Sequence, residues 1–170
     1  MKINIQEWLD TFRPELKPPV GNKVIFENED LLVMAVAGPN ARTDFHYNEG
    51  TEYFYQLEGR IDLFTHENGV VVKNELKAGD MFLLSPRVPH SPVRHEGSLG
   101  LVIETKRKPG QKDGLMWFCS QCHHKLYEEY FELKSIERDF LPVFARFNQS
   151  VAHRTCAVCG VIAPADPRYL

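Results

Sequence analysis

The sequence has little that would attract a polyanion or a membrane. Its formal net charge is −3 at pH 7 and its pI is near 6.2. Apart from Lys106–Lys108 it has no run of basic residues, so nucleic acid is not an expected partner. No stretch approaches the roughly 18 apolar residues of a membrane helix, and the first residues carry no apolar secretion segment. These absences predict a soluble, cytoplasmic protein that does not bind membranes.

Cysteine is also scarce, and the few cysteines are all paired in sequence. They form two Cys-x-x-Cys pairs with none left over. In a chain expected to be cytoplasmic, this usage favours metal thiolates over disulfides. Four thiolates complete a tetrahedral metal site, so the neighbouring His123 and His124 are not expected to be ligands. The expected ligands are Cys119, Cys122, Cys156 and Cys159.

The length of the chain limits its organisation. With 170 residues it can form one hydrophobic core and a small appendage, but not two full-sized domains. The chain has no internal repeat and no low-complexity tract. The residue pattern changes after Pro109-Gly110, where the short predicted strands are followed by the segment that contains the cysteine pairs. We therefore predict a main domain over residues 1–110, with an N-terminal helix and arm, and a C-terminal extension over residues 111–170.

The main domain is rich in β-strand signals. A short amphipathic helix is predicted over residues 4–12, and the proline-rich arm over residues 14–21 should lack regular structure. Further on, short strands alternate with turn signals such as Asn68-Gly69, which predicts an all-β, two-sheet antiparallel barrel. In the extension, a helix is predicted over residues 141–151 with Pro142 in its first turn. The predicted strands include residues 31–38, 51–59, 60–67, 81–84, 99–107 and, less clearly, 123–134.

The strongest functional signal is the stretch Arg42–Gly59, RTDFHYNEGTEYFYQLEG. Two short strands joined by the turn at residues 48–50 would aim the His46 imidazole and the Glu52 carboxylate at one point. Taken alone, the pair is better explained as a surface hairpin. His90 changes this interpretation, because it follows a buried-looking strand and a proline-flanked turn and can supply a third ligand. Two imidazoles and one carboxylate with open positions are typical of ferrous iron that binds substrate and dioxygen.

These motifs resemble one family over nearly the whole chain. GPNARTDFH, EYFYQLEG, GDMFLLSPRVPHSP and LVIE, followed by the cysteine pairs, are similar to the bacterial 3-hydroxyanthranilate 3,4-dioxygenases of the cupin superfamily. The general cupin pattern also has a metal-binding Glu followed seven residues later by Gly, here Glu52 and Gly59. Two positions depart from it: Asn48 stands where many cupins have a second His, and Val88 where many have Gly. The missing imidazole leaves three neighbouring coordination positions free, as the resemblance implies.

The resemblance implies an Fe(II)-dependent ring-cleaving dioxygenase. Its substrates would be 3-hydroxyanthranilate and O2. Its product, 2-amino-3-carboxymuconate semialdehyde, closes without an enzyme to quinolinate, a precursor of NAD in the kynurenine pathway of tryptophan degradation. The fold implied is a cupin barrel, an antiparallel double-stranded β-helix, with a small rubredoxin-like extension in which the four cysteines hold a structural Fe or Zn ion. A homodimer is also implied.

The resemblance assigns roles to individual side chains as well. Arg42 and Arg94 would grip the substrate carboxylate, which suits a planar guanidinium, and Arg42 would also contact O2. Glu104 would hydrogen-bond the substrate's amine or hydroxyl and help to remove a proton. Glu52 would lie against the substrate as well as the metal. The implied ligands of the catalytic Fe2+ are His46, Glu52 and His90.

Interpretations that give these residues no functional role stay open at this point. Arg42 and Arg94 taken singly would more often be solvated surface charges, although each lies four residues from an expected iron ligand. Glu104 ends an apolar run and would then be a strand end that emerges into water. Two other functions compete with the first. One is a cupin dioxygenase that acts on another carboxylated aminophenol, and the other is a non-catalytic, metabolite-binding cupin whose cysteine module is an interaction finger.

Overall fold

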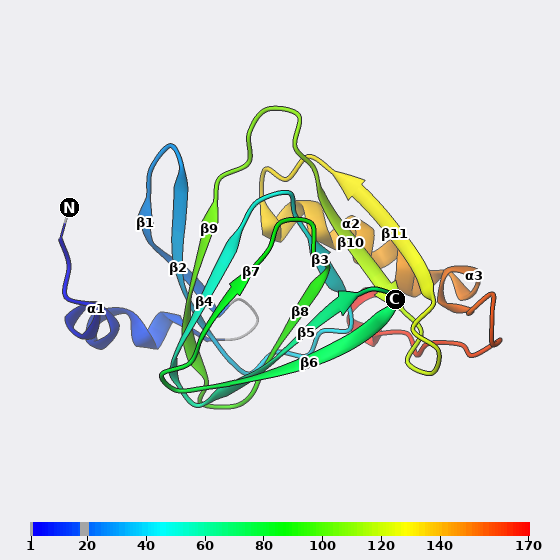
Figure 1. Ribbon diagram of the computed structural model, residues 1–170, viewed down its shortest axis with the longest axis horizontal. Helices are drawn as coiled ribbons and strands as arrows, with labels where there is room; N and C mark the ends of the chain where they lie inside the picture. The colour runs from blue at the N-terminus through cyan, green and yellow to red at the C-terminus, as the bar shows by residue number, and fades with distance from the viewer. Residues whose placement is uncertain (1, 18–20) are drawn as a thin grey trace.

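The structure is a computed structural model that describes residues 2–17 and 21–170. Its strands form two antiparallel sheets (Figure 1). The five-stranded sheet has the order β1-β2-β9-β4-β7, and the six-stranded sheet has the order β11-β10-β3-β8-β5-β6. The elements are α1 (Ile5–Phe12), the 3-10 turn η1 (Arg13–Glu15), β1 (Asn22–Glu27), β2 (Leu31–Ala37), β3 (Phe45–Tyr47), β4 (Glu52–Glu58), β5 (Arg60–Glu67), β6 (Val70–Lys77), β7 (Met81–Leu84), β8 (His90–Arg94), β9 (Leu99–Thr105), β10 (Asp113–Phe118), β11 (Lys125–Phe131), α2 (Ile136–Gln149), α3 (Val151–Arg154) and the 3-10 turn η2 (Pro167–Tyr169).

The core lies between the two sheets because side chains alternate along each strand. In β4, Glu52, Phe54 and Gln56 are buried, whereas Tyr53 and Tyr55 between them are half-buried. The expected antiparallel two-sheet barrel is therefore confirmed. The buried side chains of the main hydrophobic cluster are Met34, Phe54, Ile61, Leu63, Leu76, Leu84 and Val102.

The N-terminal helix α1 forms where the sequence predicts it. The Asn4 side chain caps the helix by accepting hydrogen bonds from backbone N–H groups of the first turn, one of them at 2.9 Å. Leu9 is buried in a small cluster with Ala35 and Leu99 of the five-stranded sheet. One helical face is thus fixed on the outside of the barrel, next to the β1–β2 hairpin (Figure 1).

Two predictions about proline are wrong. Arg13–Glu15 form a 3-10 turn, because Pro14 fits the first turn of a helix, where its missing N–H costs nothing. Pro142 lies inside α2, because this helix begins at Ile136 and not near residue 141. Packing of the helix's apolar face outweighs the hydrogen bond that an internal proline removes. Residues 18–20, which contain the other prolines of the arm, lie outside the described residues.

The C-terminal extension shares a sheet with the barrel. β10 pairs with β3 on one side and with β11 on the other, so the six-stranded sheet continues across residue 110. Helices α2 and α3 lie beside β10 and β11 (Figure 1). The division into residues 1–110 and 111–170 stays a prediction. The extension has its own cluster of buried side chains, Leu115, Trp117, Phe140, Val143 and Phe147.

Helix length bears on the prediction about membranes. Within the described part of the chain, every helix is too short or too polar to span a bilayer.

Candidate metal centre and active site

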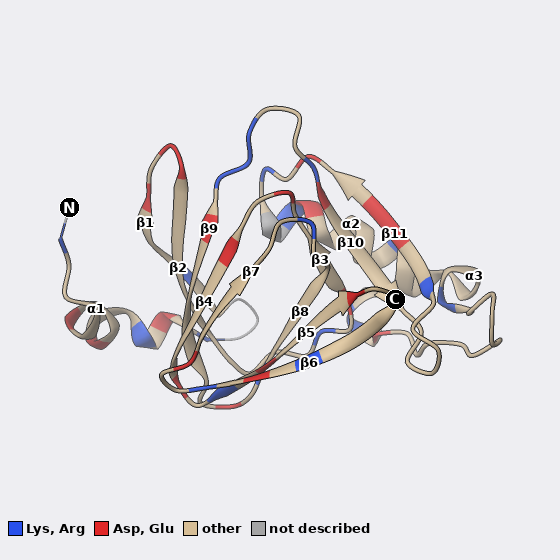
Figure 2. Ribbon diagram, in the orientation of Figure 1, with Lys and Arg blue, Asp and Glu red and all other residues tan. Residues whose placement is uncertain are grey.

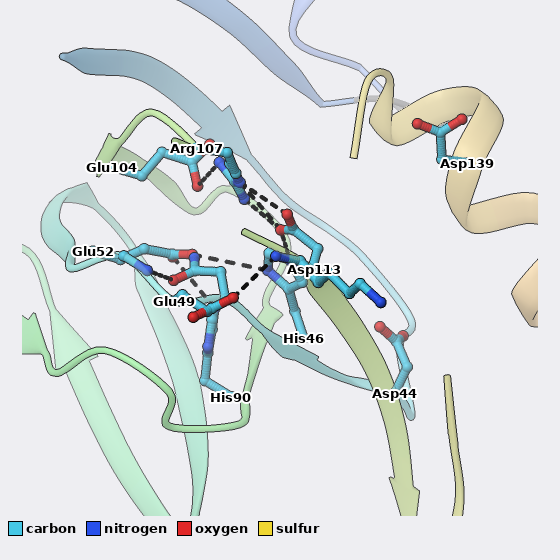
Figure 3. Close-up of polar contacts among 12 residues, drawn as sticks. Asp44, His46, Glu49, Glu52, His90, Glu104, Arg107, Asp113 and Asp139 are labelled. Atoms are coloured by element: carbon cyan, nitrogen blue, oxygen red, sulfur yellow. Dashed lines mark hydrogen bonds and ion pairs between the residues drawn. The ribbon is translucent and has the colours of Figure 1, made fainter. Parts of the chain in front are cut away.

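Three side chains that the sequence singled out converge inside the barrel. His46 on β3 and His90 on β8 are cross-strand partners in the six-stranded sheet, and Glu52 begins β4 in the opposite sheet. All three are buried, and one ligand atom of each lies within 4.8 Å of the other two. Nε2 of His90 is 3.3 Å from Oε2 of Glu52, and Nδ1 of His46 is 3.8 Å from Oε1 of Glu52 (Figure 3). The alternative interpretation, a surface hairpin with His46 and Glu52 in water, is therefore wrong.

Hydrogen bonds orient both imidazoles. Nδ1 of His90 lies 3.1 Å from the carbonyl oxygen of Val88, so a proton on Nδ1 leaves Nε2 free toward Glu52. Nε2 of His46 lies 2.7 Å from Oδ1 of Asp113, which is fully buried. A proton on that nitrogen leaves Nδ1 of His46 free toward Glu52. Partners of this kind fix the tautomer and the ring orientation of metal-binding histidines.

The surroundings keep Glu52 ionised and His46 neutral. Burial acts to raise the pKa of Glu52, but the charge and hydrogen bond of His90 outweigh it and lower this pKa to about 2. Burial lowers the pKa of His46. Burial also opposes the charge on His90, but the Glu52 carboxylate raises the pKa of His90 overall. Asn48, the position where many cupins have a second His, donates its side-chain amide to Glu52. A metal binds the carboxylate and neutral imidazoles, so a bound ion would compete with the proton on His90.

Glu104 lies inside the barrel and not at a strand end in water. It is the cross-strand partner of Glu52 in the β4–β9 ladder and is 4 % exposed. Burial, followed by the negative charge of Glu52, raises the pKa of Glu104 to about 7. Its Oε2 forms an ion pair with Nη1 of Arg107 at 3.0 Å. A carboxyl group that titrates near neutral pH is suited to accept and return a proton.

Arg94 and Arg42 differ in how well they are paired. Arg94 lies on the same face of β8 as His90 and is 3 % exposed, yet its Nη1 has no hydrogen-bond partner among the described residues. Burial, followed by the charge of Arg42, lowers the pKa of Arg94 to about 10. Arg42 donates from Nε to Oδ1 of Asp44 at 3.3 Å. An anion at Arg94 would satisfy a buried donor that the protein leaves free.

The C-terminal extension covers this region. The ring of Phe140 on α2 lies 5.5 Å from the His46 ring, and Nη2 of Arg168 donates to the Ala41 carbonyl at 2.7 Å. A cavity of about 700 Å³ lies between the loop of residues 39–44, α2 and the C-terminal residues, and Arg42 lines it. The extension thus forms one wall of the cavity at Arg42.

Sequence reasoning missed three residues at the site. Asp113 and Phe140 contact the His46 ring, and Arg107 contacts both Asp113 and Glu104. The available signal was a carboxylate at the start of the apolar strand DGLMWF, because such a charge needs a buried partner. Neither Arg107 within a basic run nor Phe140 on a helix carries a comparable signal.

The four cysteines form a second cluster. Their sulfur atoms lie within 4.8 Å of one another, with Cys119 to Cys159 and Cys122 to Cys156 both at 3.5 Å. These distances are too long for disulfides. A hydrogen bond from the backbone N–H of Cys159 lowers the pKa of Cys156 to about 6, which favours its thiolate. The sulfur set therefore fits a tetrahedral metal ion.

Known proteins match this chain at several levels. A family model described as 3-hydroxyanthranilic acid dioxygenase matches residues 1–148. A 3-hydroxyanthranilate 3,4-dioxygenase from Xanthomonas euvesicatoria pv. vesicatoria is 54% identical over 167 residues, which cover 98% of this chain and 94% of that protein. One from Ruegeria pomeroyi is 46% identical over 163 residues, which cover 95% and 91%. A cupin-2 domain containing protein from Shewanella frigidimarina, 21% identical, matches with a TM-score of 0.50 over 61% of this chain and 94% of its own, which shows the cupin fold.

We expect Glu52→Ala to lose the metal bound in the barrel. The substitution removes the negative charge of the cluster and leaves two neutral imidazoles to hold a divalent ion. Metal analysis of the purified variant should show about one equivalent less than the wild type, with the cysteine-bound metal retained.

The matched control is Glu58→Ala, which removes an exposed carboxylate from the same strand. It should keep both metals. Normal metal content in Glu52→Ala would contradict the assignment of the barrel ligands.

Proposed function

The chain belongs to the 3-hydroxyanthranilic acid dioxygenase family, and from this premise we propose that it cleaves the ring of 3-hydroxyanthranilate with O2. The product is 2-amino-3-carboxymuconate semialdehyde, in which both oxygen atoms of O2 are retained. The observation that carries the proposal is the buried cluster of His46, Glu52 and His90, with the buried Arg94 further along the same face of β8 as His90. An aromatic acid with adjacent amine and hydroxyl groups matches a metal centre on a strand that also carries a buried guanidinium with a free donor.

Ferrous iron is the metal that we propose for the barrel. Two imidazole nitrogens and one carboxylate oxygen suit this ion, and the ligand atoms lie close enough together for one ion to reach all three. When bound, Fe2+ supplies the redox chemistry between the ring and O2. Binding, orientation and proton transfer then fall to the side chains.

The side chains that surround the cluster divide these tasks. Arg94 and Arg42 bind the carboxylate, and Arg42 also contacts O2. Glu104, whose pKa is raised to about 7, accepts a proton from the ring hydroxyl or amine. Glu52 lies opposite it, against both the metal and the substrate. Phe140 excludes water from one side of His46.

The cysteine site and the pathway complete the proposal. Cys119, Cys122, Cys156 and Cys159 would hold Fe or Zn in a structural role, because four thiolates leave no open position for a substrate. Reduced metal-binding cysteines fit the cytoplasm. Spontaneous closure of the product gives quinolinate, which places the reaction in the kynurenine pathway of tryptophan degradation, on the route to NAD.

The proposal is tested with iron-loaded protein and 3-hydroxyanthranilate in air. One O2 should be consumed for each ring cleaved, while the absorbance of the semialdehyde rises and then decays to that of quinolinate. O2 uptake with another carboxylated aminophenol alone would favour the related dioxygenase. No uptake by protein with a filled barrel site would favour a non-catalytic cupin.

We expect Arg94→Ala to weaken substrate binding more than turnover. Loss of a buried, charge-assisted contact costs about 2 to 5 kcal/mol, so the KM for 3-hydroxyanthranilate should rise by roughly 30-fold to several thousand-fold. 2-Aminophenol, which lacks the carboxylate, should be a poor substrate of the wild type and lose little more in the variant.

Steady-state kinetics with both compounds provide the measurement. Arg60→Ala, which removes an arginine that is half exposed, serves as the matched control and should leave both KM values unchanged. An equal penalty on the two compounds in Arg94→Ala would show that Arg94 does not bind the carboxylate.

We expect kcat/KM to fall as the pH drops below about 7. Only the deprotonated form of Glu104 accepts a proton, and its pKa is raised to about 7, so the active form is lost on the acidic side. A pH profile should show this acidic limb in the wild type. Glu104→Gln should have a lower rate without the limb, and a limb that persists in this variant would refute the role of Glu104.

A homodimer is proposed through the outer face of the five-stranded sheet. On the edge strand β7, Met81 and Leu83 are 61% and 66% exposed. They pair with Tyr55 and Tyr53 of β4, and Ile103 of β9 follows Tyr53 across the sheet. Figure 2 shows that β7 carries no charged residue. An apolar row of this kind on an open sheet face favours a second copy of the chain.

We expect Leu83→Asp to convert the dimer into a monomer. A charge in the centre of an apolar interface remains desolvated and unpaired when two copies associate. Sedimentation velocity at micromolar concentration provides the measurement. Val72→Asp, at an exposed position of the other sheet, should remain dimeric. A wild type that sediments as a monomer would contradict the proposal.

A further inference from the structure

A continuous chain of charged groups runs behind the candidate metal centre. Nε2 of His46 lies 2.7 Å from Oδ1 of Asp113. Arg107 donates to the same carboxylate from Nη2 at 2.6 Å and from Nε at 3.0 Å, and its Nη1 forms an ion pair with Oε2 of Glu104 at 3.0 Å. Figure 3 shows Arg107 between Glu104 and Asp113. One guanidinium therefore joins the partner of a candidate metal ligand to the candidate proton acceptor.

The geometry of this chain of charged groups requires an arginine at position 107. Its fork places two nitrogens on Asp113 and leaves the third for Glu104, which a lysine ammonium cannot reproduce in the same fixed directions. Asp113 is fully buried and the Arg107 side chain is 19% exposed. Burying such charges costs solvation free energy, and stability alone does not explain them, because apolar residues often fill such sites equally well.

Strand pairing fixes the backbone at His46 but does not by itself fix the orientation of the imidazole ring. β3 has only three residues, and its pairing with β8 is limited to His46 and His90. β10 holds the other side of β3, where Leu115 is opposite His46. Asp113 begins the same strand β10 and reaches the ring directly. The C-terminal extension thus supplies the side chain that sets the ring orientation.

We propose that Asp113 and Arg107 are positioning residues of this site. Asp113 fixes the His46 imidazole for the metal, and Arg107 holds Asp113 and Glu104 in register with each other. The metal part of this proposal stands on the ligand geometry, whereas the part that concerns Glu104 rests on the proposed dioxygenase function. Asp113 acts through His46, and Arg107 acts through Asp113 and Glu104.

The first test is Fe2+ affinity of the barrel site, measured anaerobically by competition with a chelator in protein whose cysteine site is filled. Asp113→Ala should bind Fe2+ about 10- to 100-fold more weakly than the wild type. Asp113→Asn, which keeps an acceptor oxygen, should lie between the two. The control is Asp139→Ala, which removes a carboxylate on α2, away from the cluster, and should bind normally (Figure 3).

The second test separates positioning from a general structural role. Arg107→Met keeps much of the side-chain volume but removes the fork, so it should weaken Fe2+ binding and also lower kcat at saturating iron. Because Arg107 acts on the metal through Asp113, the double variant that combines Asp113→Ala with Arg107→Met should bind Fe2+ no more weakly than Asp113→Ala alone. Its kcat should nevertheless fall below that of Asp113→Ala, since Glu104 has lost its partner. Arg107→Lys should recover part of kcat.

Several outcomes would overturn the proposal. Wild-type Fe2+ affinity in Asp113→Ala, or losses in affinity that add in the double variant, would show that the chain does not position His46. If Asp113→Ala does not fold, Asp113→Asn decides, and it should bind about 10-fold more weakly than the wild type. Affinity needs no turnover, so inactivity of the wild type toward 3-hydroxyanthranilate would refute the proposed function and leave the role of Asp113 standing.

Discussion

The burial of the Glu52 carboxylate is the constraint on which the rest of the site depends. A carboxylate is expensive to bury, and here His90 and Asn48 offset that cost and keep Glu52 ionised. Burial, followed by the same negative charge, raises the pKa of its cross-strand neighbour Glu104 to about 7. One buried charge thus sets up both a metal ligand and a group that can exchange protons at neutral pH. Metal binding by Glu52 and proton exchange by Glu104 therefore both depend on the same buried charge.

The fold explains why these groups meet. Glu52 and Glu104 come from the five-stranded sheet, whereas His46 and His90 come from the six-stranded sheet, so the centre forms only when the two sheets close on each other. The C-terminal extension contributes as well, because Asp113 belongs to β10, which pairs with β3. The extension is therefore part of the active barrel in space, even though its composition sets it apart in the sequence.

Sequence reasoning predicted the parts that local patterns encode. The alternating strands predicted the barrel, and the turn between His46 and Glu52, together with the position of His90 after a proline-flanked turn, indicated a candidate cluster, while the family resemblance supplied the roles. Arg107 was indistinguishable from a solvated basic run, since its partners are chosen by tertiary packing. Pro142 misled the placement of α2 for the same reason: the apolar face of the helix, and not local propensity, decides where the helix begins.

Arg42 and Arg94 differ in the hydrogen bonds that they make in the free protein, and this difference affects how each would meet an anion. Arg42 is already engaged by Asp44, so an arriving carboxylate must share or displace that contact. Arg94 has a buried nitrogen without a partner among the described residues, and its pKa is lowered to about 10 by burial and by the charge of Arg42. A carboxylate at Arg94 satisfies the free donor and reduces the repulsion between the two cations. Under the proposed function, binding of the substrate carboxylate would relieve an existing cost at Arg94 and compete with an existing bond at Arg42, so Arg94 should be the stronger determinant of affinity.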